Sequence, residues 1–304
     1  MLGPDYFNYI FHVTGNKDRG AALEQSFEDY GDTTTLYQPG FHLPFSRFPA
    51  MNADSSQVLL PVLFVNTTRM QDGNPGIVTN LKVDSAYFNQ RVDVLQLLDK
   101  DKDISLASGA ILGARFPYLS PAGRIGNNYF VDGGYFDNSG AGVVQELLRG
   151  IVTLAWDDSL HGNRWIYERV KRLHIKVLHV MNSPIDGADT LREVAPIKND
   201  LLSPILTIVG AYDKQTTVND ARLYHYLEDV NTYFHVRAEH YRISLYKDSL
   251  EWKADPRYKR GATEAAYSMN WFMSDTTRNR IDERLQKDTV IDRIIRQFNS
   301  LPCN

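Results

Sequence analysis

Short apolar runs and helically spaced apolar positions divide the first third of this chain into predicted elements. In residues 17–30, Ala22, Leu23 and Phe27 recur on one side of a 3.6-residue period, which predicts an amphipathic helix. Residues 59–67 form a run of apolar and β-branched residues, which predicts a buried strand. The turn sequence DGNPG follows, so we expect residues 77–79 to return as a second strand.

The stretch 105–148 carries the most distinctive pattern of the chain. Residues 129–131 are a short aromatic and β-branched run, typical of a buried strand. This strand delivers one carboxylate, Asp132, into a turn that begins with Gly133 and Gly134. Successive glycines can adopt positive φ and allow another backbone or a substrate to come close.

A helix is predicted directly after this turn. Residues 143–148 have apolar positions at helical spacing, and Asn138 or Ser139 can cap the helix. An acid between a buried strand and a helix N-terminus is where α/β enzymes place working groups. The pattern fits equally well a turn aspartate, Asp132, that caps its own loop.

The second half of the chain predicts one more strand and several helices. Residues 173–180 alternate and indicate a strand, on which His174 and His179 face opposite sides and cannot share a metal ion. His235 and His240 flank a predicted turn, and no HExxH motif occurs, so we expect no metal site and no cofactor. Helices are expected over residues 198–230, 263–273 and 275–298. Repeats, low-complexity tracts and a convincing linker are absent, so we expect one domain over residues 1–304.

Composition narrows the class of protein. The chain has 304 residues, 43% of them hydrophobic, which is enough to bury a substantial core. The net charge of −4 provides no field that attracts nucleic acid. The single cysteine, Cys303, excludes an internal disulfide and fits a reducing compartment. We find no signal peptide and no apolar run of the length that crosses a bilayer, so a cytoplasmic or peripheral membrane location is expected.

The stretch 105–148 resembles the second signature block of the patatin-like phospholipases, which are lipid acyl hydrolases. In that family a small-residue helix leads to a Phe-Pro pair, a variable turn, a strand ending in Asp-Gly-Gly or Asp-Gly-Ala, and then an asparagine. The counterparts in this sequence are Ala107-Ser108-Gly109-Ala110, Phe116-Pro117, Gly123, Tyr129, Asp132-Gly133-Gly134 and Asn138. One departure is that Ser139-Gly140 stands where the family often has residues leading to proline.

The resemblance implies a three-layer α/β sandwich with a mainly parallel central sheet. It also implies that Asp132 partners a serine in a Ser–Asp dyad, with Gly133, Gly134 and Asn138 shaping the turn. The substrate would be a lipid or another acyl ester, met at a membrane surface, with no nucleic-acid partner. The likeness is best over residues 17–150, and residues 198–304 would form a helical extension. The number of subunits is left open.

The nucleophile that this family requires is absent from the sequence. Glycines four residues apart occur once, at Gly109 and Gly113, and the central residue is Ile111 rather than serine. A glycine-rich oxyanion loop is also absent, so Met1 looks like an internal start and the dyad serine would lie upstream of it. We therefore expect a partial patatin-like domain that lacks its N-terminal strands.

Two other classes of function stay open. The first is a patatin-like module that has lost its nucleophile and binds lipid or a protein partner. The second is an unrelated α/β binding domain in which Asp132 is only a turn residue.

A missing nucleophile strand would have a structural consequence. In a patatin-like sheet that strand lies in the interior, between strands that this chain supplies. We therefore expect residues 59–67 and 129–131 to have unpaired N–H and C=O groups along one side. With apolar side chains partly uncovered as well, the chain is expected to be poorly soluble or to self-associate.

Overall fold

The computed structural model describes residues 19–33, 41–48, 61–116, 120–162, 164–181, 196–247, 249–256 and 274–299. The chain divides into two compact units. Unit 1 comprises Met1–Val170 and Pro204–Leu223, and unit 2 comprises Lys171–Ser203 and Tyr224–Asn304. Residues 1–18 and the predicted helix over 263–273 lie outside the described residues.

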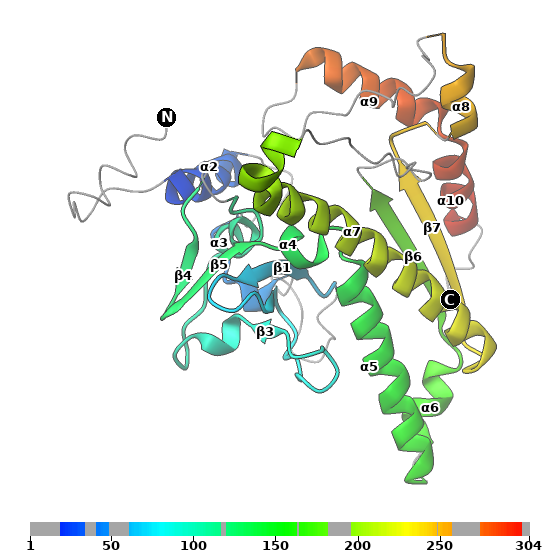
Figure 1. Cartoon of the computed structure of the whole chain (residues 1–304). Helices are drawn as coiled ribbons and strands as arrows, with labels where there is room; N and C mark the ends of the chain where they lie inside the picture. Colours follow the sequence, from blue (N-terminus) through cyan, green and yellow to red (C-terminus); the bar gives the residue numbers. More distant parts are fainter. Residues whose placement is uncertain are drawn as a thin grey trace. The chain divides into compact units, whose positions relative to one another are not determined.

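The sheet of unit 1 has five strands in the order β3-β2-β1-β5-β4 (Figure 1). Their bounds are β1 Phe64–Arg69, β2 Pro75–Thr79, β3 Val92–Asp93, β4 Gly123–Ile125 and β5 Asn128–Asp132. The mixed α/β class is confirmed. The expectation of a mainly parallel sheet does not hold for this sheet, because β1/β2, β1/β5 and β4/β5 are antiparallel and β2/β3 is the parallel pair.

Connection lengths explain this arrangement. The turn between β1 and β2 spans residues 70–74 and that between β4 and β5 spans residues 126–127, and such short turns join antiparallel neighbours. A parallel pair needs a longer crossover, which residues 80–91 provide between β2 and β3. The predicted hairpin after residues 59–67 is therefore present, with β1 beginning at Phe64.

The expectation of an unpaired side on the central strands is wrong. β1 pairs with β2 on one side and with β5 on the other, and β5 also pairs with β4. No gap for a further strand exists between β1 and β5, where Thr67 lies opposite Asp132. Self-association of the chain stays a prediction, but an open interior strand cannot be its cause.

Both faces of the sheet are covered at β2, whose residues are all buried. Val78 packs with Phe45, Leu112 and Phe130, together with Leu106 of helix α3 (Leu106–Leu112). Its neighbour Ile77 packs instead with Val83, Phe88 and Val143, the last from helix α5 (Ala141–Leu160). Because successive strand residues point to opposite faces, α3 and α5 cover opposite faces of the sheet.

The remaining elements of unit 1 are short, apart from one helix. Helix α2, Arg19–Thr33, confirms the helix predicted over residues 17–30 and lies against α3. The short strand β3 is followed by the 3₁₀ turn η3, Leu95–Leu97. The list is completed by η1 Phe45–Arg47, α4 Gly134–Asp137 and α6 Trp165–Val170.

Unit 2 contains a two-stranded parallel sheet of β6 (His174–Met181) and β7 (Arg237–Ser244). The predicted strand over 173–180 is confirmed, but the turn expected between His235 and His240 is not there, because His240 lies within β7. Helix α7, Pro196–Thr232, precedes β7 and contributes residues to both units. The region expected to be a helical extension therefore contains a strand.

The last predicted helix is divided into two. Helix α9, Asp275–Lys287, and helix α10, Thr289–Asn299, meet at Asp288, and α8 is Ser249–Ala254. The Asp288 carboxylate accepts a hydrogen bond from the Ile291 backbone N–H at 3.2 Å and so begins a new helix. None of the helices in the described ranges combines the length and the apolar character needed to cross a membrane.

Candidate functional site

Asp132 ends β5 and stands at the start of the predicted turn, as expected. Its backbone N–H donates to the Arg115 carbonyl at 3.0 Å, and the next N–H, of Gly133, donates to the Gly113 carbonyl at 3.2 Å. On the other side of β5, the Thr67 hydroxyl donates to the Val131 carbonyl at 2.7 Å. The carboxylate is thus presented by backbone that is held from both sides.

The two glycines are required by close packing rather than by unusual dihedral angles. A Cβ on Gly133 would lie 2.3 Å from the Asn66 carbonyl oxygen, and a Cβ on Gly134 would lie 2.8 Å from Asp132 Oδ1. Gly133 has φ of −69°, which any residue adopts. The positive φ that the sequence pattern allowed is found further on, at Gly140, with φ of 74°.

The Asp132 carboxyl group is half-buried and has one hydrogen bond among the described residues. Its Oδ1 accepts from the Gly134 backbone N–H at 2.6 Å. Burial raises the pKa of the Asp132 carboxyl above its ordinary value, and the hydrogen bond from Gly134 opposes this shift. No described cation forms an ion pair with it. Oδ1 therefore caps the turn, while the group as a whole keeps the proton affinity of a desolvated carboxylate.

Asn138 lies at the end of the same turn and is exposed. Its Oδ1 would be 2.7 Å from a Cβ on Gly134, so the Asn138 side chain at the end of α4 lies beside Gly134 at the start of that helix. Asp132, Gly133, Gly134 and Asn138 are thus brought together, within one turn between β5 and α5.

The cap of helix α5 is neither of the residues that the sequence suggested. Gly140 is the N-cap residue, and the Ser139 hydroxyl accepts only a 3.3 Å bond from the Ala141 N–H at the first turn. The carboxylate of Asp137 fulfils this role instead, because it accepts from the N–H groups of Gly142 at 3.1 Å and Val143 at 2.9 Å. Asp137 therefore holds the start of helix α5.

Behind the turn lies a buried ionic network that sequence reasoning missed. Arg91 donates to Glu146 at 2.5 Å and to Asp137 at 3.2 Å, and these three side chains are at most 6% exposed. The amides of Asn66 and Asn219 also donate to the Asp137 carboxylate, at 3.2 and 3.4 Å. The network joins β1, the loop before β3, α5 and α7 behind the Asp132 turn. The sequence signal for it is weak: Arg91 is one cation in a mostly apolar segment.

Within the stretch 105–148, two described serines have carboxylate partners. Ser108 donates to Glu24 at 3.1 Å, and Ser139 donates to Asp220 at 2.5 Å. Neither is in a glycine-flanked elbow. The N–H groups beside Ser139 at the start of α5 are already bonded to Asp137 and to Ser139 itself, so they are not available to stabilise an oxyanion. Neither serine has the surroundings of a nucleophile.

Metal ligands are not assembled in the described ranges: no group of three His, Cys, Asp or Glu side chains could hold an ion there. In unit 2, His179 and His240 stack across β6 and β7 with ring centroids 5.5 Å apart. His174, the first residue of β6, contacts Glu239 of β7 at 2.9 Å.

Comparison with known proteins adds no assignment: no family model, curated protein or solved structure matches the chain.

Proposed function

We propose that this chain is part of a lipid acyl hydrolase of the patatin-like type. Asp132 is the carboxylate of a Ser–Asp dyad, and the serine belongs to a segment upstream of Met1 in a longer protein. The observation that carries the proposal is the surroundings of Asp132: a half-buried carboxyl with a raised pKa, fixed on a glycine turn at the end of an interior strand.

The chemistry needs a base for a weak nucleophile. A serine hydroxyl attacks an ester carbonyl slowly at neutral pH because it keeps its proton. A carboxylate within hydrogen-bond reach orients the hydroxyl and accepts its proton as the serine oxygen bonds to the acyl carbon. The resulting carboxylic acid returns that proton to the leaving alkoxide oxygen as the ester C–O bond breaks. Desolvation makes Asp132 a stronger base than a solvated aspartate, which supports this role.

If the serine lies on an upstream strand, the proposal requires that strand to join the sheet of unit 1 at one of its edges. β1 and β5 are paired on both sides, which leaves β3 and β4 as the edges among the described strands. The covering of opposite faces by α3 and α5 supports a three-layer arrangement that parallel strands from upstream would extend. The protein would act as a cytoplasmic or peripheral enzyme on lipid at a membrane surface.

The test compares Asp132→Asn with wild type in the chain extended by its natural upstream sequence. We expect hydrolysis of a short-chain p-nitrophenyl ester to fall by about 10²–10⁴-fold with an unchanged melting curve. Asp99→Asn, in an exposed ion pair with Lys102, is the matched control and should keep full activity. Residues 1–304 without the extension should show no turnover. Unchanged activity of the extended Asp132→Asn variant would reduce Asp132 to a turn residue.

A second candidate is a patatin-like module that binds lipid or a protein and has no activity. The bond from the Gly134 N–H to Asp132 Oδ1 favours it, because a turn-capping aspartate needs no catalytic partner. This second candidate would be supported if the extended chain neither hydrolysed esters nor reacted covalently with a fluorophosphonate probe, yet still sedimented with phospholipid vesicles.

A further inference from the structure

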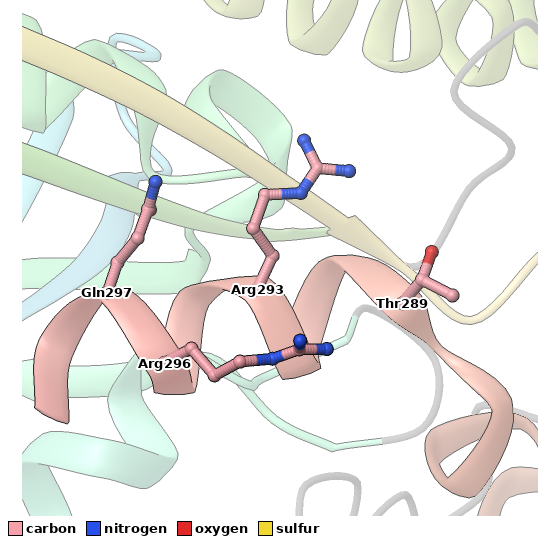
Figure 2. Close-up of a pocket in the computed structure, with 4 residues that line it drawn as sticks. All are labelled: Thr289, Arg293, Arg296 and Gln297. Atoms are coloured by element: carbon pink, nitrogen blue, oxygen red, sulfur yellow. The ribbon is translucent and has the colours of Figure 1, made fainter. Parts of the chain in front are cut away.

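Helix α10 of unit 2 forms the wall of a surface pocket of about 470 Å³ (Figure 2). Among the described residues, four polar side chains line it: Thr289, Arg293, Arg296 and Gln297. Their spacing places them on one side of the helix. Figure 2 shows the stems of Arg293 and Arg296 extending toward the Thr289 end of the helix.

The apolar side of α10 explains why this polar side is presented outward. Ile294 is buried and Ile291 is partly buried, and α10 packs against β7. A helix with one apolar stripe packed on its own unit directs the opposite residues to solvent. The four lining side chains therefore lie on the side of α10 that faces away from its apolar stripe.

Among the described residues, no acid offsets the positive charge of this pocket. Two of its four described lining side chains are cationic and none is anionic. Within the part of the chain that the structure describes, neither Arg293 nor Arg296 forms an ion pair with a carboxylate. The Nε of Arg296 donates to the Asp292 carbonyl at 3.3 Å, which leaves the outer nitrogens of its guanidinium for a ligand.

The nearest acid on β7 is already occupied. Arg293 lies close enough to Tyr241 to influence its hydroxyl electrostatically, and that hydroxyl donates to Glu239. Glu239 also contacts Arg237 at 2.8 Å and His174 at 2.9 Å. Since Glu239 is held by three partners of its own, it does not neutralise Arg293.

We propose that this pocket binds a phosphate group carried on a small organic body. Two guanidinium groups and the Thr289 hydroxyl offer donors to three or more oxygens at once. A phosphate supplies that number, whereas a carboxylate has two. The volume exceeds that of a bare phosphate ion, so an attached body such as glycerol fits. The proposal does not depend on the proposed function of Asp132, because the pocket lies in unit 2.

The test is a titration of the full chain with sn-glycerol 3-phosphate, inorganic phosphate and acetate, followed by amide chemical shifts and calorimetry. Vesicles of phosphatidic acid and of phosphatidylcholine form a separate arm. We expect glycerol phosphate to bind more tightly than phosphate, and acetate to bind weakly. The double variant Arg293→Ala/Arg296→Ala should lose at least tenfold in affinity, and Arg293→Lys/Arg296→Lys should retain part of it.

Arg278→Ala on helix α9 is the control, because Arg278 is 66% exposed and its contact to Asp275 is long, at 4.0 Å. It should bind like wild type, and all variants should keep the same far-UV circular dichroism. Selective binding of the phosphatidic acid vesicles, lost in the double alanine variant, would identify a lipid headgroup as the source of the phosphate. Binding of glycerol phosphate without vesicle binding would identify a soluble ligand. No phosphate binding in any form, or equal loss in Arg278→Ala, would overturn the proposal.

Discussion

Replacing Arg91 by methionine should destabilise unit 1 strongly. The guanidinium is 1% exposed and neutralises two buried carboxylates, Glu146 at 2.5 Å and Asp137 at 3.2 Å. Removing one partner of a buried ion pair leaves an uncompensated charge and costs about 3–5 kcal/mol. A domain typically has about 5–15 kcal/mol of stability in total. The variant should therefore approach the limit of folding.

The two carboxylates should not contribute equally. Asp137 keeps the helix α5 N–H groups and two asparagine amides after Arg91 is removed. Glu146 keeps one described partner, the Asn89 amide at 3.1 Å. Most of the penalty should thus fall on Glu146, and Glu146→Gln in the Arg91→Met background should recover part of the loss.

Hydrogen exchange of the β1 and β5 amides measures this loss, because it reports unfolding of unit 1 separately from that of unit 2. Lys102→Met removes an ion pair in which both side chains are more than 60% exposed, and should cost no more than about 1 kcal/mol. An Arg91→Met loss as small as that of Lys102→Met would refute the reasoning. So would a double variant less stable than Arg91→Met itself.

Three further predictions concern the turn and the histidine pair. Because the folded-state pKa of Asp132 lies above its ordinary 3.8, ionisation of this carboxyl opposes folding at pH 7. Asp132→Asn should therefore match or exceed wild type in thermal stability at pH 7, with no difference below about pH 4, and a clear loss of stability at pH 7 would contradict this. Burial, with the charges of neighbouring His179 and Arg242, lowers the pKa of His240 from 6.5 to about 4, so unit 2 should lose stability as pH falls through that range. The full shift corresponds to about 3.4 kcal/mol, which solvent around the partly exposed ring reduces to about 2 kcal/mol, and His240→Phe should flatten the profile in pH-dependent urea melts. Gly133→Ala should destabilise by about 1–3 kcal/mol in urea melts and more than Gly134→Ala, because the first methyl meets a backbone oxygen and the second meets side-chain atoms that can move.

Local patterns in the sequence were sufficient to predict several elements. The helical period over residues 17–30 and the DGNPG turn correspond to α2 and the β1–β2 hairpin, because helix periodicity and tight turns depend on residues close in the chain. The strand, the two glycines and the helix around Asp132 follow from the same kind of signal. The alternation of residues 173–180 also predicted a strand, though not its partner.

Tertiary structure decided which segments meet. Arg91 forms ion pairs with Asp137, which is 46 positions further along the chain, and with Glu146, which is 55 positions further. No local pattern encodes such a pairing. Local patterns also do not encode whether neighbouring strands are parallel or antiparallel, that β6 pairs with β7, or that β1 is paired on both sides. Strand order depends on how the connections cross the fold. No local pattern in the sequence marks Asp137 as the cap of helix α5. Asp137 becomes the cap of α5 because the fold buries it beside Arg91, where a carboxylate must find both N–H donors and a cation.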